Sequence, residues 1–197
     1  MRFKLLGTEI YISFFFAALV TLMLACDRTG MALPMFFAIF AHEMGHLFAM
    51  WATDNAPKSV RLIPASVQIT RNITQRYKSD ITVALCGPIV NIILFLTLYF
   101  NYIAFKNELT LYYGLLNLIV AIFNLLPVAG LDGGTVLYCL LANKLPLNRA
   151  ILTVRIITFT TAAAVLITAI ILTVGGKINL SLYIIAIYLF ISSLMKI

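Results

Sequence analysis

One group of residues has the types and the spacing for metal chemistry: His42, Glu43 and His46. On a helix, residues i and i+4 lie on one face, so two imidazoles can bind one Zn²⁺ there and the intervening carboxylate can reach its water. The chain of 197 residues has only two histidines, and both belong to this motif. A polar patch at a helix end, or hydrogen bonding between helices, is the alternative explanation.

The composition places this motif in a membrane protein. Hydrophobic residues make up 62% of the chain and charged residues 11%, against about 45–50% and 25% in soluble domains. We therefore predict an all-α polytopic membrane protein with about six transmembrane helices, forming a single domain over residues 1–197. A disordered chain, a coiled coil and a soluble nucleic-acid binder fit poorly. The predicted spans are residues 10–26, 31–50, 81–105, 109–126 (with a turn to 131), 152–174 and 180–194, with an amphipathic connector at 135–150.

The cost of ionisable groups in a membrane favours the metal interpretation. Each such side chain within a span costs roughly 2.5 kcal/mol or more, and the second predicted span carries three within five residues. A bound divalent metal compensates this cost.

A third ligand is needed, because catalytic zinc takes three protein ligands and a water. The chain has seven acidic residues, and Asp132 is the best placed of them. It follows the fourth span, it lies on the same predicted side as the histidines, and flanking glycines allow close backbone approach. The alternative is that Asp132-Gly133-Gly134 only forms a turn.

The basic residues predict the orientation in the membrane. With six spans, most of them fall on the side that holds both termini, which should be cytoplasmic. The active site would open toward that side. Because these residues are explained by topology and lipid contacts, we expect no nucleic-acid partner. The residues on that side are Arg2, Lys4, Lys58, Arg61, Arg71, Arg76, Lys78, Lys144, Arg149, Arg155 and Lys196, and those opposite are Arg28, Lys106 and Lys177.

Residues 59–74 form part of the longest polar stretch. Apolar and polar residues alternate there in places, and Pro64-Ala65-Ser66 would supply a turn. A short membrane-associated β-hairpin and an irregular surface loop are equally consistent with this pattern.

Three asparagines lie within predicted spans. Asn91, one turn after Gly87-Pro88, could donate to an oxyanion, but hydrogen bonding between helices is the simpler explanation. Asn117 and Asn124 lie seven residues apart, roughly on one helix face. They could bind substrate backbone or bridge helices.

Together these clusters resemble the site-2 protease family of intramembrane zinc metalloproteases. The resemblance rests on Ala41–His46, on Gly87–Asn91 and on the segment Asn124–Gly134, which reads NLLPVAGLDGG. The six-span layout and Leu137–Ala150 look most like the subgroup of the sporulation protease, which cleaves a membrane-associated sigma-factor precursor.

The resemblance implies a role for each of these residues. His42, His46 and Asp132 would bind Zn²⁺, Glu43 would be the general base, and Asn91 would line the catalytic site. The segment 59–74 would match a re-entrant hairpin whose edge pairs with substrate. The partners would be a membrane-tethered protein substrate, the lipid bilayer, and inhibitory or regulatory membrane proteins.

Three features depart from the family pattern. Val128-Ala129-Gly130 stands where a second proline is often found, and there is neither a PDZ nor a CBS domain. We therefore predict a zinc metalloendopeptidase that cleaves a tethered regulator or sigma-factor precursor within or near the bilayer. The alternatives are an inactive membrane chaperone or regulatory subunit with a structural metal, and an ion transporter.

Overall fold

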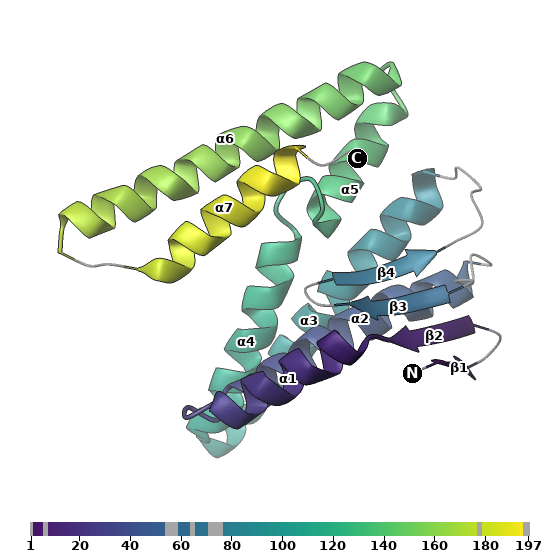
Figure 1. Ribbon diagram of the computed structural model, residues 1–197. Coiled ribbons are helices and arrows are strands. Elements are labelled where there is room, and N and C mark those ends of the chain that lie inside the picture. Colours follow the sequence, from purple (N-terminus) through teal and green to yellow (C-terminus); the bar gives the residue numbers. More distant parts are fainter. Residues whose placement is uncertain are drawn as a thin grey trace. The chain divides into compact units, whose positions relative to one another are not determined.

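The computed structural model describes residues 2–5, 8–53, 59–63, 66–70, 77–176 and 179–194. The chain divides into two compact units, Met1–Ala121 and Ile122–Ile197. The boundary between the units falls near the end of the helix Glu108–Asn124. Figure 1 labels their helices and strands.

The first unit contains a four-stranded sheet with the order β1-β2-β3-β4. β1 pairs with β2 and β3 with β4 in antiparallel fashion, whereas β2 and β3 are parallel. The β3–β4 pair runs in register from Ser59 opposite Thr70 to Ile63 opposite Ser66, so a β-hairpin lies where the sequence left hairpin and loop open. The strands are β1 (Arg2–Leu5), β2 (Thr8–Ile12), β3 (Ser59–Ile63) and β4 (Ser66–Thr70).

The expectation for the N-terminal segment was wrong. A first span over residues 10–26 was predicted, but β2 extends to Ile12 and α1 (Phe14–Cys26) has only 13 residues. Thr8, Ile10 and Ile12 are β-branched, which favours strand, and β3 supplies a pairing partner from 50 residues downstream. The expectation of an all-α fold is therefore incomplete.

The first unit also holds the helix pair that positions the histidines. α2 (Ala32–Ala52) packs along α3 (Tyr77–Phe105), and α4 (Glu108–Asn124) follows, ending within the second unit. The crossing of α2 and α3 is close at Gly45. A Cβ there would lie 2.7 Å from the carbonyl oxygen of Cys86 and 3.0 Å from the Cα of Gly87.

The second unit consists of the end of α4, a turn, and three helices. α6 and α7 lie side by side (Figure 1). Its core is formed by buried side chains from the turn and from these two helices, namely Val128, Leu131, Ala162 and Leu189. The predicted connector at 135–150 is mostly helical: α5 (Asp132–Ala142) precedes α6 (Leu147–Val174), and α7 spans Leu180–Leu194.

The chain is an integral membrane protein with several apolar spans. In the described part, α2, α3 and α6 are long and apolar enough to cross a bilayer, whereas α4, α5 and α7 are apolar but shorter. At 1.5 Å per residue, the 17 residues of α4 cover about 26 Å of a hydrocarbon core of about 30 Å. Of the six predicted spans, three are thus found as helices long enough to cross a bilayer.

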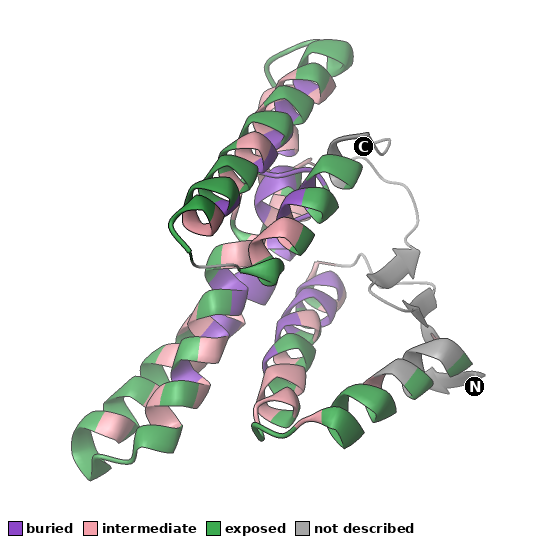
Figure 2. Ribbon diagram, turned by 60° about the vertical axis from the view of Figure 1, so that its left-hand side comes forward, coloured by how far each residue is buried: buried purple, intermediate pink, exposed green. Residues whose placement is uncertain are grey.

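Many residues of these helices are exposed (Figure 2), and large apolar side chains are among them. Phe48 of α2 is 71% exposed and Phe100 of α3 is 65% exposed. Extended apolar surface of this kind is unusual on a soluble monomer, and a lipid environment accounts for it.

Gly45→Ala should destabilise the first unit, because the added methyl group meets backbone atoms of α3 that cannot rotate away. Overpacking of this kind typically costs about 1–3 kcal/mol. Thermal unfolding of the detergent-purified chain should show a lower Tm for this variant. Met44→Ala, at a neighbouring exposed position, is the control and should change Tm little; an equal Tm for Gly45→Ala and the wild type would contradict close packing at Gly45.

Candidate metal centre

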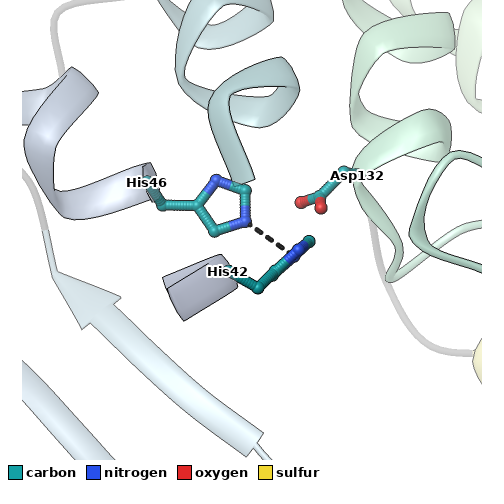
Figure 3. Close-up of side chains that lie close together, drawn as sticks. All are labelled: His42, His46 and Asp132. Carbon is teal, nitrogen blue, oxygen red and sulfur yellow. Dashed lines mark hydrogen bonds between the residues drawn. The ribbon is translucent and has the colours of Figure 1, made fainter. Parts of the chain in front are cut away.

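His42 and His46 lie one turn apart on α2 and turn their rings toward each other (Figure 3). Their Nε2 atoms are 3.1 Å apart, and the ring planes are nearly perpendicular, at 87°. Both side chains are buried, at 4% and 7% exposure. The two Nε2 atoms therefore converge on one point in a protected interior.

The opposite ring nitrogens are held by oxygen atoms of α3. The Nδ1 atom of His42 is 2.8 Å from Oδ1 of Asn91, and the Nδ1 atom of His46 is 2.8 Å from the carbonyl oxygen of Val83. Because both oxygens accept hydrogen bonds, each Nδ1 donates one, and in a neutral imidazole this leaves the lone pair on Nε2.

This tautomer pair fits a cation. Between two neutral rings with both protons on Nδ1, the Nε2 lone pairs at 3.1 Å would repel each other, and a cation beside them would remove this repulsion. Metal-bound histidines characteristically donate the other ring N–H to a carbonyl or carboxylate-type oxygen, which fixes their orientation. The donor set of this site thus matches a metal centre better than a pair of core histidines.

Gly87 and Pro88 make room for this arrangement. A Cβ at Gly87 would lie 2.5 Å from Cε1 and Nε2 of His46 and 2.9 Å from Cε1 of His42. Pro88 lies inside α3 and is fully buried. Since proline lacks an N–H and its ring crowds the carbonyl of residue i−4, Pro88 disturbs the helix at Ala84, next to Val83, whose carbonyl oxygen binds His46.

Asn91 and Asn117 belong to the same cluster. Asn91 is fully buried; its Nδ2 group donates to the carbonyl oxygen of Ala38 and to Oδ1 of Asn117, both at 2.9 Å. Asn117 is 7% exposed and donates from Nδ2 to the carbonyl oxygen of Tyr113. Both N–H groups of Asn91 are used within the protein, which favours a role in orienting His42 over donation to an oxyanion.

Asp132 is the first residue of α5, in the second unit (Figure 3). The preceding turn includes Gly130 in the left-handed region, with φ +86°. The backbone N–H of Ala129 donates to the buried hydroxyl of Thr158 on α6 over 2.8 Å. A negative charge is also favourable at the N-terminus of a helix, so the local structure holds this carboxylate in a defined place.

The two glycines after Asp132 pack against the turn. A Cβ at Gly133 would clash with the carbonyl oxygens of Leu125 and Leu126, and one at Gly134 with that of Val128. Close backbone approach was expected of these glycines, and the structure confirms it. The segment therefore does more than end α4: it forms a compact turn, and the next helix, α5, begins directly after it.

His42, His46 and Asp132 are a group of described residues that could hold a metal ion. Two imidazoles and a carboxylate form the ligand set of a catalytic zinc site, with a fourth position for water. Glu43 lies between the two histidines on α2 and is half-buried. Asn124, the last residue of α4, is also half-buried and belongs to the second unit.

Several contributors to the site have no direct signal in the sequence. The carbonyl oxygens of Val83, Ala38 and Tyr113 accept hydrogen bonds from the polar cluster, but a backbone atom has no residue type to detect. Pro88 indicates a disturbed helix, but the carbonyl that it leaves without a helical partner is that of Ala84. Thr158 resembles the other threonines of α6 in sequence.

Comparison with known proteins identifies the fold. The structure is similar to that of the Site-2 Protease from Methanocaldococcus jannaschii, with a TM-score of 0.71 over 98% of this chain and 93% of that one. Sequence identity is 19%, so this likeness establishes the fold alone. The chain therefore has the fold of a site-2 protease.

Part of the sequence is similar to that of a curated protein. The chain is 34% identical over 117 residues to a protein of Synechocystis named "Putative zinc metalloprotease sll0528". The match covers 54% of this chain but only 30% of that protein, so it spans less than a third of the relative's length. No family model matches the chain.

Gly87→Ala should weaken Zn²⁺ binding, because the new methyl group displaces both imidazole rings. A loss of about tenfold or more is expected, similar to that caused by removing a residue that orients a ligand. Competition with a chelating dye measures the Kd. Gly114→Ala, whose Cβ would meet Leu98 at 3.4 Å, is the control; equal affinities for the two variants would show that the histidines do not need the space above Gly87.

Proposed function

We propose that this chain is an intramembrane zinc metalloprotease of the site-2 type, which hydrolyses a peptide bond in a membrane protein. The observation that carries the proposal is the convergence of two buried Nε2 atoms, 3.1 Å apart, with both Nδ1 atoms held by oxygen acceptors. The fold likeness and the Synechocystis relative support the same chemistry.

Asp132 is the proposed third ligand. Its carboxylate completes the set of two imidazoles and one carboxylate that catalytic zinc takes. Gly130 and Thr158 hold the turn that precedes it. His42, His46 and Asp132 are also the group of described residues suited to a metal ion.

The proposed chemistry divides between the ion and Glu43. A zinc ion in this site supplies Lewis acidity that polarises the scissile carbonyl and acidifies water. The Glu43 carboxylate accepts a proton as the water oxygen forms a bond to the carbonyl carbon. It then delivers that proton to the amide nitrogen as the carbon–nitrogen bond breaks. His42 and His46, fixed by Asn91 and Val83, keep their lone pairs directed at the ion.

The sheet offers a way to hold the substrate. A transmembrane helix must unwind before its peptide bonds become accessible, which leaves its backbone groups unpaired. β4 stands at the end of the described sheet, paired through one edge with β3. An extended substrate segment could add to its other edge as a further strand, in the same unit as His42 and His46.

The finer assignments belong to this proposal as well. The distribution of Lys and Arg supports cytoplasmic termini, and a tethered transcriptional regulator or sigma-factor precursor is the proposed substrate class. Assignment to the sporulation subgroup rests on Leu137–Ala150 and the predicted six-span layout. Asn124 remains a proposed substrate contact, and inhibitory membrane proteins remain proposed partners.

Glu43→Gln should retain zinc and lose proteolysis, because an amide cannot accept the proton of water. The rate should fall by about 10²- to 10⁴-fold, the usual contribution of a general base. The assay is cleavage of a co-expressed membrane-tethered sigma-factor precursor, followed by immunoblot, with zinc content measured on the purified variant. Cleavage at the wild-type rate would rule out Glu43 as the base.

Asp132→Asn should weaken Zn²⁺ binding by more than about 100-fold, beyond the 10- to 100-fold typical of residues that only orient ligands. The neutral amide is a poorer ligand of nearly the same shape, so folding should be preserved. Glu108→Gln, at an exposed acidic residue, is the control. Wild-type affinity in Asp132→Asn would mean that another group supplies the third ligand.

A further inference from the structure

We infer that Asn117 is a positioning residue for the metal centre, acting on His42 through Asn91. The inference rests on the proposed zinc site and assigns Asn117 a role other than binding substrate. It follows from one chain of hydrogen bonds that crosses three helices of the first unit, from α4 through α3 to α2.

Each hydrogen bond in this chain has a determined direction. The carbonyl oxygen of Tyr113 can only accept, so it receives the Nδ2 group of Asn117, 2.9 Å away. The Oδ1 atom of Asn117 consequently faces Asn91 and accepts from its Nδ2 group. The Oδ1 atom of Asn91 is then the one that faces Nδ1 of His42.

The direction of this chain decides which nitrogen of His42 can bind metal. With Oδ1 of Asn91 as acceptor, the proton of the neutral ring stays on Nδ1, and Nε2 keeps its lone pair. If the Asn91 amide turned over, its NH₂ group would face Nδ1 and favour the opposite tautomer, with the proton on Nε2. That proton would occupy the position at which the ion must bind.

Two acceptors hold the Asn91 amide against this reversal: the carbonyl oxygen of Ala38 and Oδ1 of Asn117, each at 2.9 Å. Turning the amide over would place its oxygen against both of them, at a position removed from bulk solvent, because Asn91 is fully buried. The Ala38 carbonyl comes from α2, the helix that also carries His42. Asn117 is therefore the residue through which α4 holds the Asn91 amide in this orientation.

The burial of Asn117 favours this positioning role over substrate binding. Asn117 is 7% exposed, and its Oδ1 and Nδ2 atoms are both engaged within the protein. A substrate backbone would have to break one of these bonds to contact it. Its position suits the orientation of Asn91.

The test is a double-mutant cycle on the full-length, detergent-purified chain. Asn91→Leu, Asn117→Leu and the double variant are titrated with Zn²⁺ against a chelating dye, and the visible spectrum of bound Co²⁺ reports the ligand field. Asn91→Leu should weaken binding by about 10- to 100-fold, and Asn117→Leu by about tenfold. The double variant should bind no more weakly than Asn91→Leu, since one residue acts through the other.

Gly114→Ala is the matched control, because it alters the contact of α4 with Leu98 and Phe95 of α3 but leaves the amides in place. It should keep the wild-type Kd and Co²⁺ spectrum. Wild-type affinity in Asn117→Leu, an equal loss in Gly114→Ala, or losses that multiply in the double variant would each overturn the inference.

Two further outcomes keep the test decisive. If Asn91→Leu does not fold, the comparison of Asn117→Leu with Gly114→Ala decides on its own. If the wild-type chain binds no stoichiometric Zn²⁺, the proposed function fails, and the inference fails with it. Stoichiometric Zn²⁺ in the wild type with an unchanged Kd in Asn117→Leu overturns the inference alone.

Discussion

The structure of the site depends on two imidazole lone pairs that face each other inside a membrane protein. Nε2 of His42 and Nε2 of His46 approach to 3.1 Å, while Asn91 and Val83 hold the protons on the opposite nitrogens. Between two neutral rings in a buried setting such an approach is costly without a cation. Much of the surrounding structure meets this constraint: it supplies an acceptor behind each ring, space in front of it, and an anionic ligand.

The elements around the histidines meet these demands locally. Gly45 brings α2 against α3, Gly87 leaves room for the rings, and the Val83 carbonyl binds His46. In the second unit, Thr158 and Gly130 fix the turn before Asp132. Small residues within helices, which weaken a helix in water, here allow close packing.

The sequence was most informative where the membrane made polar residues costly. With two histidines and seven acids in the chain, the choice of His42, Glu43, His46 and Asp132 needed little else. The strands β1 and β2 could not be predicted, because β2 pairs with β3 some 50 residues away and β1 pairs with β2. Asn91 was placed at the site, but its hydrogen bonds favour orientation of His42 over contact with an oxyanion. An amide can serve either purpose, and only its neighbours decide between them.

X-ray absorption spectroscopy at the zinc edge tests the central claim most directly, because it reports the ligands of the ion in the intact, purified chain without a substrate. The account predicts one zinc per chain, with scattering from two imidazoles and a carboxylate oxygen, and loss of imidazole scattering in His42→Ala. Substoichiometric zinc, or a coordination shell without imidazole, would contradict it.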